Sequence, residues 1–321
     1  GLESAVYTTL VIAGALYLAF LLAGGVLVLA TFLVALVGCG VLCTVGVIVA
    51  MDTVVRVSDN TRGIAEMEGD VDEEGGAVRT GQGVVADPVK ATTRALATAT
   101  AVIAATAVFV SFRDTVITEL SDFAGTLSKP PSSYLQTTIG DAGVSTPTTL
   151  IGVLLGAAVV FLCAGLTMDA VGQARRDIVR ELPTGLLALF APVAVGFGLG
   201  VAPLAGFLGG AIATGVLLAV SCSNSGATTL RGDTVEPDRL RGDAVMDSAV
   251  SAVNSLLKVM SLVALLVAPA IVSLSLGTDA SPWLRYGIAV AALVITVVAV
   301  AVGRNRRADV VTEGMGQTPI T

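Results

Sequence analysis

Long apolar stretches separated by short polar segments run along the whole chain. The first, residues 5–51, contains no charged residue and is long enough for two membrane crossings, since one crossing takes about 20 apolar residues. Each crossing must be helical, because a backbone in lipid has to satisfy its own hydrogen bonds. The pattern predicts eight spans, at about 5–24, 27–51, 90–112, 150–172, 185–200, 203–223, 248–275 and 285–303. We therefore expect an all-α polytopic membrane protein, with one helical domain over residues 1–303 and a tail over residues 304–321.

Two shorter features refine this pattern. The fifth and sixth predicted spans are separated only by a Gly/Pro-rich hinge around Pro203. Aromatic residues make up 4% of the chain, and Trp283 and Tyr286 are the clearest candidates for the belt of aromatic side chains at a membrane surface.

Composition supports a membrane protein and excludes several kinds of site. Hydrophobic residues make up 54% of the chain, charged residues 13%, and the mean hydropathy is +0.87, whereas soluble domains carry about 25% charged residues. Membrane lipid is therefore the first expected partner. The chain has no histidine, which excludes imidazole zinc sites and nucleophiles activated by histidine. It has no basic stripe, which argues against nucleic acid as a partner.

The distribution of basic residues predicts the orientation. Of the 18 Lys and Arg residues, only Arg113, Lys129 and Arg285 fall on one side of the eight spans, and Lys258 lies within a span. All the others fall on the opposite side, which the positive-inside rule makes cytoplasmic. We expect both ends and three loops to be cytoplasmic, namely residues 52–89, 173–184 and 224–247. The segment 113–149 would form an extracytoplasmic loop.

Spaced carboxylates border the cytoplasmic ends of two spans. Asp52 and Asp59 are seven residues apart, and Asp243 and Asp247 are four apart, so each pair shares one face of a continuous helix. Carboxylates without histidine favour Mg²⁺, which takes oxygen ligands and often shares them with phosphate. The alternative for Asp243 and Asp247 is charge compensation at a helix N-terminus, worth up to about 1 kcal/mol each.

Asn254 and Lys258 lie one turn apart within the seventh predicted span. A lysine at membrane depth is costly unless it is paired or close to water, and is therefore a candidate functional residue. The alternative is that the Lys258 ammonium reaches back to the membrane surface.

Four segments resemble motifs of the membrane-integral pyrophosphatases, the family of pyrophosphate-energised proton or sodium pumps. Residues 51–67 (M-D-T-V-V-R-V-S-D-N-T-R-G-I-A-E-M) are similar to the family pattern T-D-A-Y-G-P-I-A-D-N-A-G-G-I-A-E-M. Residues 165–172 resemble A-L-T-M-x-A-V-G, residues 242–247 resemble G-D-T-V-G-D, and residues 252–269 resemble S-L-N-I-L-I-K-L-M-S-I-V-S-L-V-F-A-P. The motifs occur in the family's order and span most of the chain.

The resemblance implies Mg²⁺-dependent pyrophosphate hydrolysis coupled to ion transport, most simply proton transport. Pyrophosphate would lie at the cytoplasmic ends of the helices, clamped by lysines and by Mg²⁺ on aspartates. The metal-binding positions implied are Asp59, Asp87, Asp243 and Asp247. Of these, Asp243 and Asp247 would also be the catalytic pair that positions the attacking water. Family members form homodimers, which implies a second copy as a partner.

Residues 83–95 resemble the family stretch D-A-V-G-N-T-T-K-A-I-T-K-G. Lys90 and Thr93 then match the potassium-independent subclass, in which a lysine ammonium replaces a bound potassium ion.

Several family positions are substituted or deleted. Asp87 replaces an asparagine, and residues 224–234 lack an aspartate, an asparagine and two lysines of the corresponding family motif. The segment that follows G-D-T-V-G-D in the family is largely missing. Arg231 or Arg239 would have to replace a phosphate-binding lysine. The family's main substrate loop and ion-gating helices lie in its first half, so we expect this chain to be a C-terminal half with a degenerate site that is inactive alone.

Three hypotheses follow. The first is a pump that needs an N-terminal half, on the same chain or as a separate subunit. The second is a non-catalytic pseudoenzyme or membrane subunit that binds a partner or an anionic ligand. The third, a small-solute permease, ranks last because only Asn254 and Lys258 suggest an intramembrane polar path.

Overall fold

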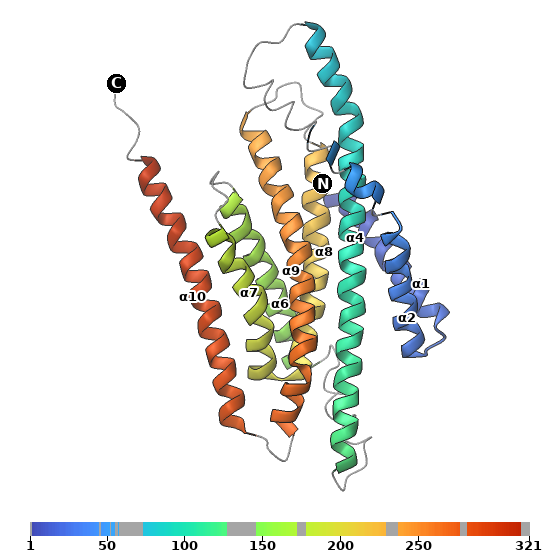
Figure 1. Ribbon diagram of the computed structural model, residues 1–321, viewed down its shortest axis with the longest axis vertical. Helices are drawn as coiled ribbons and strands as arrows, with labels where there is room; N and C mark the ends of the chain where they lie inside the picture. Colours follow the sequence, from blue (N-terminus) through green and yellow to red (C-terminus); the bar gives the residue numbers. More distant parts are fainter. Residues whose placement is uncertain are drawn as a thin grey trace. The chain divides into compact units, whose positions relative to one another are not determined.

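The computed structural model describes residues 2–44, 46–51, 53–54, 57, 73–126, 146–171, 178–228, 237–276 and 281–315. Its elements, labelled as in Figure 1, are α1 (Leu2–Leu22), α2 (Leu27–Leu42), α4 (Glu73–Thr126), α6 (Pro147–Val171), α7 (Ile178–Leu199), α8 (Val201–Thr228), α9 (Pro237–Leu276) and α10 (Pro282–Met315). The description is of the backbone over residues 2–5, 27, 73–91, 94, 124–126, 169–171, 178–181, 222–228, 237–251, 276 and 305–315. The described part of the chain contains no strand, which confirms the all-α prediction.

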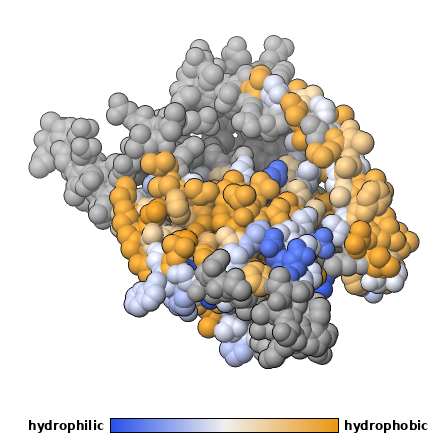
Figure 2. All heavy atoms as spheres, turned by 60° about the horizontal axis from the view of Figure 1, so that its bottom comes forward, coloured by the Kyte–Doolittle hydropathy of each residue, from blue (hydrophilic) through white to orange (hydrophobic). Residues whose placement is uncertain are grey.

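Six helical segments in the described residues are long and apolar enough to cross a membrane. They are Ala95–Phe123, Pro147–Met168, Leu182–Leu199, Val201–Ser221, Ala252–Ser275 and Pro282–Arg304. Two shorter apolar segments, Val6–Leu22 and Val28–Leu42, correspond to the first two predicted spans. Apolar side chains cover much of the described surface on the face drawn in Figure 2. The protein is therefore a polytopic helical membrane protein.

Several helices extend well beyond the spans predicted from hydropathy. α4 begins at Glu73 and ends at Thr126, so residues 73–89 and 113–126, predicted to lie in loops, are helical. The predicted loops 173–184 and 224–247 are also helical in part, because α7 begins at Ile178 and α9 at Pro237. α10 continues to Met315 and includes much of the predicted tail. Polar residues can continue a helix beyond the membrane, because they form the same backbone hydrogen bonds. Hydropathy predicts only the apolar part of such a helix, so the predicted spans are shorter than the helices.

The chain divides into two compact units. The first comprises Gly1–Ala104 and Val216–Val250, and the second comprises Ala105–Gly215 and Ser251–Thr321. The divisions fall within α4, α8 and α9, so each unit is described by itself below.

In the first unit, α1 and α2 form a helical hairpin. Gly24 and Gly25 make the turn with φ angles of 59° and 84°, a left-handed conformation that glycine adopts without a steric penalty. A narrow stripe, including Ile12 and Ala19 of α1 and Val34 of α2, is buried, while most of the large apolar side chains of the hairpin are exposed. This exposure is that expected of helices that face lipid.

The second predicted span, 27–51, is interrupted. The α2 helix ends at Leu42, and the Thr44 hydroxyl donates a hydrogen bond of 2.7 Å to the Val41 carbonyl. A helical stretch then resumes at residues 46–51. The apolar run therefore does not form one continuous helix, and the Thr44 hydrogen bond lies at the interruption.

In the second unit, α6 and α8 meet through glycines on both helices. A Cβ atom added at Gly152 would lie 2.8 Å from the Pro203 carbonyl carbon, and one added at Gly156 would lie 2.8 Å from that of Phe207. In return, Cβ atoms at Gly206 and Gly210 would collide with the backbone of Thr149 and Val153. Both pairs have the Gly-x-x-x-Gly spacing that lets two helices approach closely in a membrane.

The junction of α7 and α8 is a single residue, Gly200, with a φ angle of 109°. A Gly/Pro-rich hinge was predicted around Pro203, and Pro203 itself lies within the first turn of α8, where proline fits because its missing N–H would have no partner in the helix. The change of direction needs a positive φ angle, which glycine supplies.

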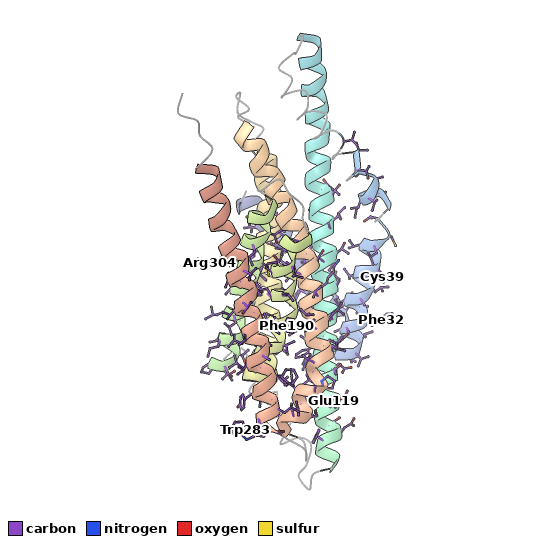
Figure 3. All side chains as sticks on the ribbon, turned by 60° about the vertical axis from the view of Figure 1, so that its left-hand side comes forward. Phe32, Cys39, Glu119, Phe190, Trp283 and Arg304 are labelled. Carbon is purple, nitrogen blue, oxygen red and sulfur yellow. The ribbon has the colours of Figure 1, made fainter. Side chains whose placement is uncertain are left out.

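The last helix, α10, packs mainly against α7. Its buried face is formed by small residues, among them Ala289, Ala292 and Ala299. Trp283 lies at the start of α10 and Arg304 lies toward its other end (Figure 3). They lie at the two ends of the apolar segment Pro282–Arg304, whose 23 residues would cross the membrane.

Candidate functional site

The predicted site residues fall into three groups. The side chains of Thr93, Asn254 and Lys258 are described. For Asp87 and Lys90 in α4, and for Arg239, Asp243 and Asp247 in α9, the backbone is described. Asp59 and Arg231 lie outside the described residues.

α4 carries the first cluster. Asp87, Lys90 and Thr93 follow one another at intervals of three residues within one continuous helix, Glu73–Thr126. Successive members of the cluster are therefore almost one helical turn apart. Asp87 was predicted to lie in a loop, but it is inside the helix. The helix thus places the backbone positions of the three residues on successive turns.

Thr93 is a buried polar residue on this helix. It is 5% exposed, and its Oγ1 has no hydrogen-bond partner among the residues that the structure describes. By contrast, Thr100 on the same helix donates a hydrogen bond of 2.8 Å to the Leu96 carbonyl. A buried hydroxyl left unpaired costs about 1–3 kcal/mol.

Thr98 shares this property, although no motif indicated it. Its side chain is fully buried, and its hydroxyl also lacks a hydrogen-bond partner among the described residues. A threonine within a helix usually satisfies its hydroxyl on a carbonyl of the preceding turn, so sequence alone could not distinguish Thr98 from Thr100.

Asp243 and Asp247 lie one turn apart on α9, as predicted. The helix begins at Pro237, which places Asp243 in the second turn and Asp247 in the third. Because the helix dipole acts mainly within the first turn, charge compensation at the N-terminus does not account for these two aspartates. Two carboxylates on neighbouring turns are suitable donors for Mg²⁺.

Asn254 and Lys258 follow on α9, within the apolar segment Ala252–Ser275. The Asn254 Oδ1 atom is buried and has no hydrogen-bond partner among the described residues. The Lys258 side chain is exposed, and no carboxylate of the described chain forms an ion pair with it. Lys258 is therefore a cation near one end of a membrane-spanning segment, without a fixed counter-charge in the described part.

Within the described residues, no group of three or more Cys, Asp and Glu side chains is arranged to hold a metal ion. The four aspartates predicted to bind Mg²⁺ all lie where side chains are not described. Those four positions therefore remain predictions.

Comparison with known proteins identifies the family. The family model described as inorganic H+ pyrophosphatase matches residues 1–184 of this chain. The chain belongs to this family. The resemblance seen in the motifs is thereby confirmed.

Three relatives show the extent of the similarity, and each is named a K(+)-insensitive pyrophosphate-energized proton pump. The relative from Streptomyces avermitilis is 41% identical over 374 residues, which cover 98% of this chain and 45% of the relative. The relative from Streptomyces coelicolor is 43% identical over 364 residues, 95% of this chain and 45% of the relative. That from Chloroflexus aurantiacus is 29% identical, over 87% of this chain and 42% of the relative. No solved structure matches the chain.

Two facts about these alignments bear on function. The chain spans about half the length of the curated relatives that it matches. The alignment with the Streptomyces avermitilis pump covers 374 residues, although the chain has only 321. Some aligned positions of the relative therefore have no counterpart in this chain.

Proposed function

We propose that this chain supplies the C-terminal half of the helical bundle of a pyrophosphate-energised proton pump, and that it does not hydrolyse pyrophosphate alone. The observation that carries the proposal is the match over 98% of the chain to about half of a proton pump. The remaining half, on the same chain or as a separate subunit, would complete the substrate site. A second copy of the assembly is the further expected partner.

In this proposal, Asp59, Asp87, Asp243 and Asp247 hold Mg²⁺ at the cytoplasmic ends of the helices. The metal would neutralise phosphate charge and help to activate water. Asp243 and Asp247, on neighbouring turns of α9, would orient that water against the phosphate. Arg231 and Arg239 would bind the phosphate groups in place of the family's lysines, because guanidinium pairs with phosphate in a two-point contact.

Lys90 and Thr93 would give potassium independence. The Lys90 ammonium would occupy the place of a potassium ion. The Thr93 hydroxyl, which has no hydrogen-bond partner among the described residues, would face the same polar position. The names of the relatives from Streptomyces support this assignment, since both are K(+)-insensitive pumps.

The proposed orientation places both ends and the polar connections at residues 52–89, 173–184 and 224–247 in the cytoplasm. In a variant without native cysteines, Arg304→Cys should react with a membrane-impermeant maleimide only from the cytoplasmic side. Trp283→Cys, at the other end of α10, should react only from the opposite side. The reverse pattern would overturn the orientation.

A non-catalytic membrane subunit is the second candidate. It is favoured by the aligned positions of the relative that have no counterpart here and by the substituted charged residues. Such a subunit would bind a partner or an anionic ligand but would not release phosphate in any assembly.

The experiment that separates the two is Mg²⁺-dependent phosphate release from pyrophosphate in membranes. The chain would be expressed alone, and also joined to the part of the Streptomyces avermitilis pump that it does not cover. The pump proposal expects release only from the joined protein. If the joined protein released no more phosphate than its Asp243→Ala, Asp247→Ala variant, the non-catalytic candidate would replace it.

A further inference from the structure

Arg285 lies in the first turn of α10 and makes a long-range contact to α7. Its Nε donates a hydrogen bond of 2.8 Å to the carbonyl oxygen of Phe197, 88 residues earlier in the chain. Phe197 is in the last turn of α7, where carbonyl groups have no partner within their own helix. Arg285 therefore satisfies one of these carbonyls and holds the start of α10 against the end of α7.

The contact fixes the guanidinium beside the Gly200 junction. One terminal nitrogen, Nη2, is 3.6 Å from the point at which a side chain at residue 200 would begin. The guanidinium carbon is also 5.4 Å from the centre of the Tyr286 ring. A guanidinium carries five N–H groups, and only the Nε–H has an acceptor among the described residues. The terminal N–H groups are thus held in place and have no acceptor among the described residues.

The surroundings of Arg285 are those of a membrane surface. Trp283 is 91% exposed and Tyr286 is 53% exposed, at the end of a 23-residue apolar segment. Figure 3 shows Trp283 at this end of α10, away from Arg304. Trp and Tyr side chains with an apolar body and a polar edge gather at the level of lipid headgroups.

We propose that Arg285, flanked by Trp283 and Tyr286, binds the phosphate of an anionic phospholipid at this end of α10. The ligand is a phospholipid rather than a free phosphate, because the flanking exposed groups are apolar and continue into a membrane-spanning surface. The charge is complementary, and guanidinium offers phosphate two parallel N–H groups. The hydrogen bond to Phe197 orients the guanidinium in advance, which lowers the entropy lost on binding. This site is independent of pyrophosphate hydrolysis.

The test uses the full chain purified in detergent. Retained lipid is measured by native mass spectrometry, and thermal unfolding is measured with added phosphatidylglycerol, phosphatidylcholine or glycerol 3-phosphate. We expect phosphatidylglycerol to be retained and to raise the melting temperature, whereas glycerol 3-phosphate at the same concentration has no effect. Arg285→Gln should bind phosphatidylglycerol at least about fivefold more weakly, because it lacks the charged two-point contact.

The matched control is Arg113→Gln. Arg113 is an exposed arginine without a hydrogen-bond partner in the described chain, so its loss removes the same charge but no built contact. Arg285→Lys keeps the charge without the planar fork and should bind with intermediate affinity, and it serves if Arg285→Gln does not fold. Equal lipid retention in the Arg285 and Arg113 variants, or stabilisation by glycerol 3-phosphate equal to that by the lipid, would overturn the proposal.

Discussion

The contact between α6 and α8 allows a sharp test of how this bundle is held together. Gly209 and Gly210 are neighbours on α8, but only Gly210 is buried. A Cβ atom at Gly210 would lie 2.8 Å from the carbonyl carbon and 2.9 Å from the Cα of Val153, whereas one at Gly209 would meet no atom within 4 Å. Gly210→Ala therefore adds a methyl group where two helices are in close contact, whereas Gly209→Ala adds the same group where no atom lies nearby.

The magnitude follows from two opposing effects. Alanine in a helix interior is favoured over glycine by about 1 kcal/mol, which both variants gain. Overpacking typically costs about 1–3 kcal/mol. Only Gly210→Ala is overpacked, because the Val153 backbone cannot rotate away from the new methyl group as a side chain can. Gly210→Ala should thus be about 1–3 kcal/mol less stable than Gly209→Ala.

The assay is thermal unfolding of the purified chain in detergent, followed by circular dichroism. With a shift of about 2–4 °C for each kcal/mol, the two melting temperatures should differ by several degrees. The same comparison on α6 sets Gly156→Ala, which meets the Phe207 backbone, against Gly165→Ala, which meets no atom within 4 Å. A Gly210→Ala variant as stable as Gly209→Ala would refute the close contact of α6 and α8.

The remaining predictions concern the candidate site. In the joined, active protein, Lys90→Ala should make phosphate release depend on added K⁺, measured as activity with and without KCl; activity that stays potassium-independent would contradict the role of the lysine. Thr98→Val should leave the melting temperature unchanged or raise it, because it removes a buried hydroxyl that has no partner among the described residues. Thr100→Val removes a hydrogen bond of 2.8 Å and should lower the melting temperature. The opposite order would show that the Thr98 hydroxyl has a partner. Saturating pyrophosphate with Mg²⁺, at about 100 times its dissociation constant, should stabilise the joined protein by about 2.7 kcal/mol, and Asp243→Ala, Asp247→Ala should abolish that stabilisation.

Much of the fold follows from the hydrophobic pattern, because lipid requires long apolar helices. The ends of those helices do not follow from it. α4 extends from Glu73 to Thr126, so its polar ends are helical beyond the apolar segment. The Gly/Pro-rich stretch around Pro203 predicted a hinge between α7 and α8, but the pattern did not indicate that Gly200, with its positive φ angle, would be the junction.

The sequence predicted the helical spacing of candidate site residues that lie close together, while their roles stay predictions. The spacing of Asp243 and Asp247 and that of Lys90 and Thr93 are properties of a single helix, and the family motifs pointed to both. The contact between Arg285 and Phe197 joins residues 88 positions apart, so it depends on how α7 and α10 pack. No pattern within either segment could have indicated it.

The most direct test of the account is proton uptake into membrane vesicles on addition of pyrophosphate and Mg²⁺. It would be measured for this chain alone and for the chain joined to the uncovered part of the Streptomyces avermitilis pump. We expect no uptake with the chain alone, and potassium-independent uptake with the joined protein that Asp243→Ala abolishes. Uptake by the chain alone, or none by a correctly folded joined protein, would contradict the assignment of this chain as one half of a proton pump.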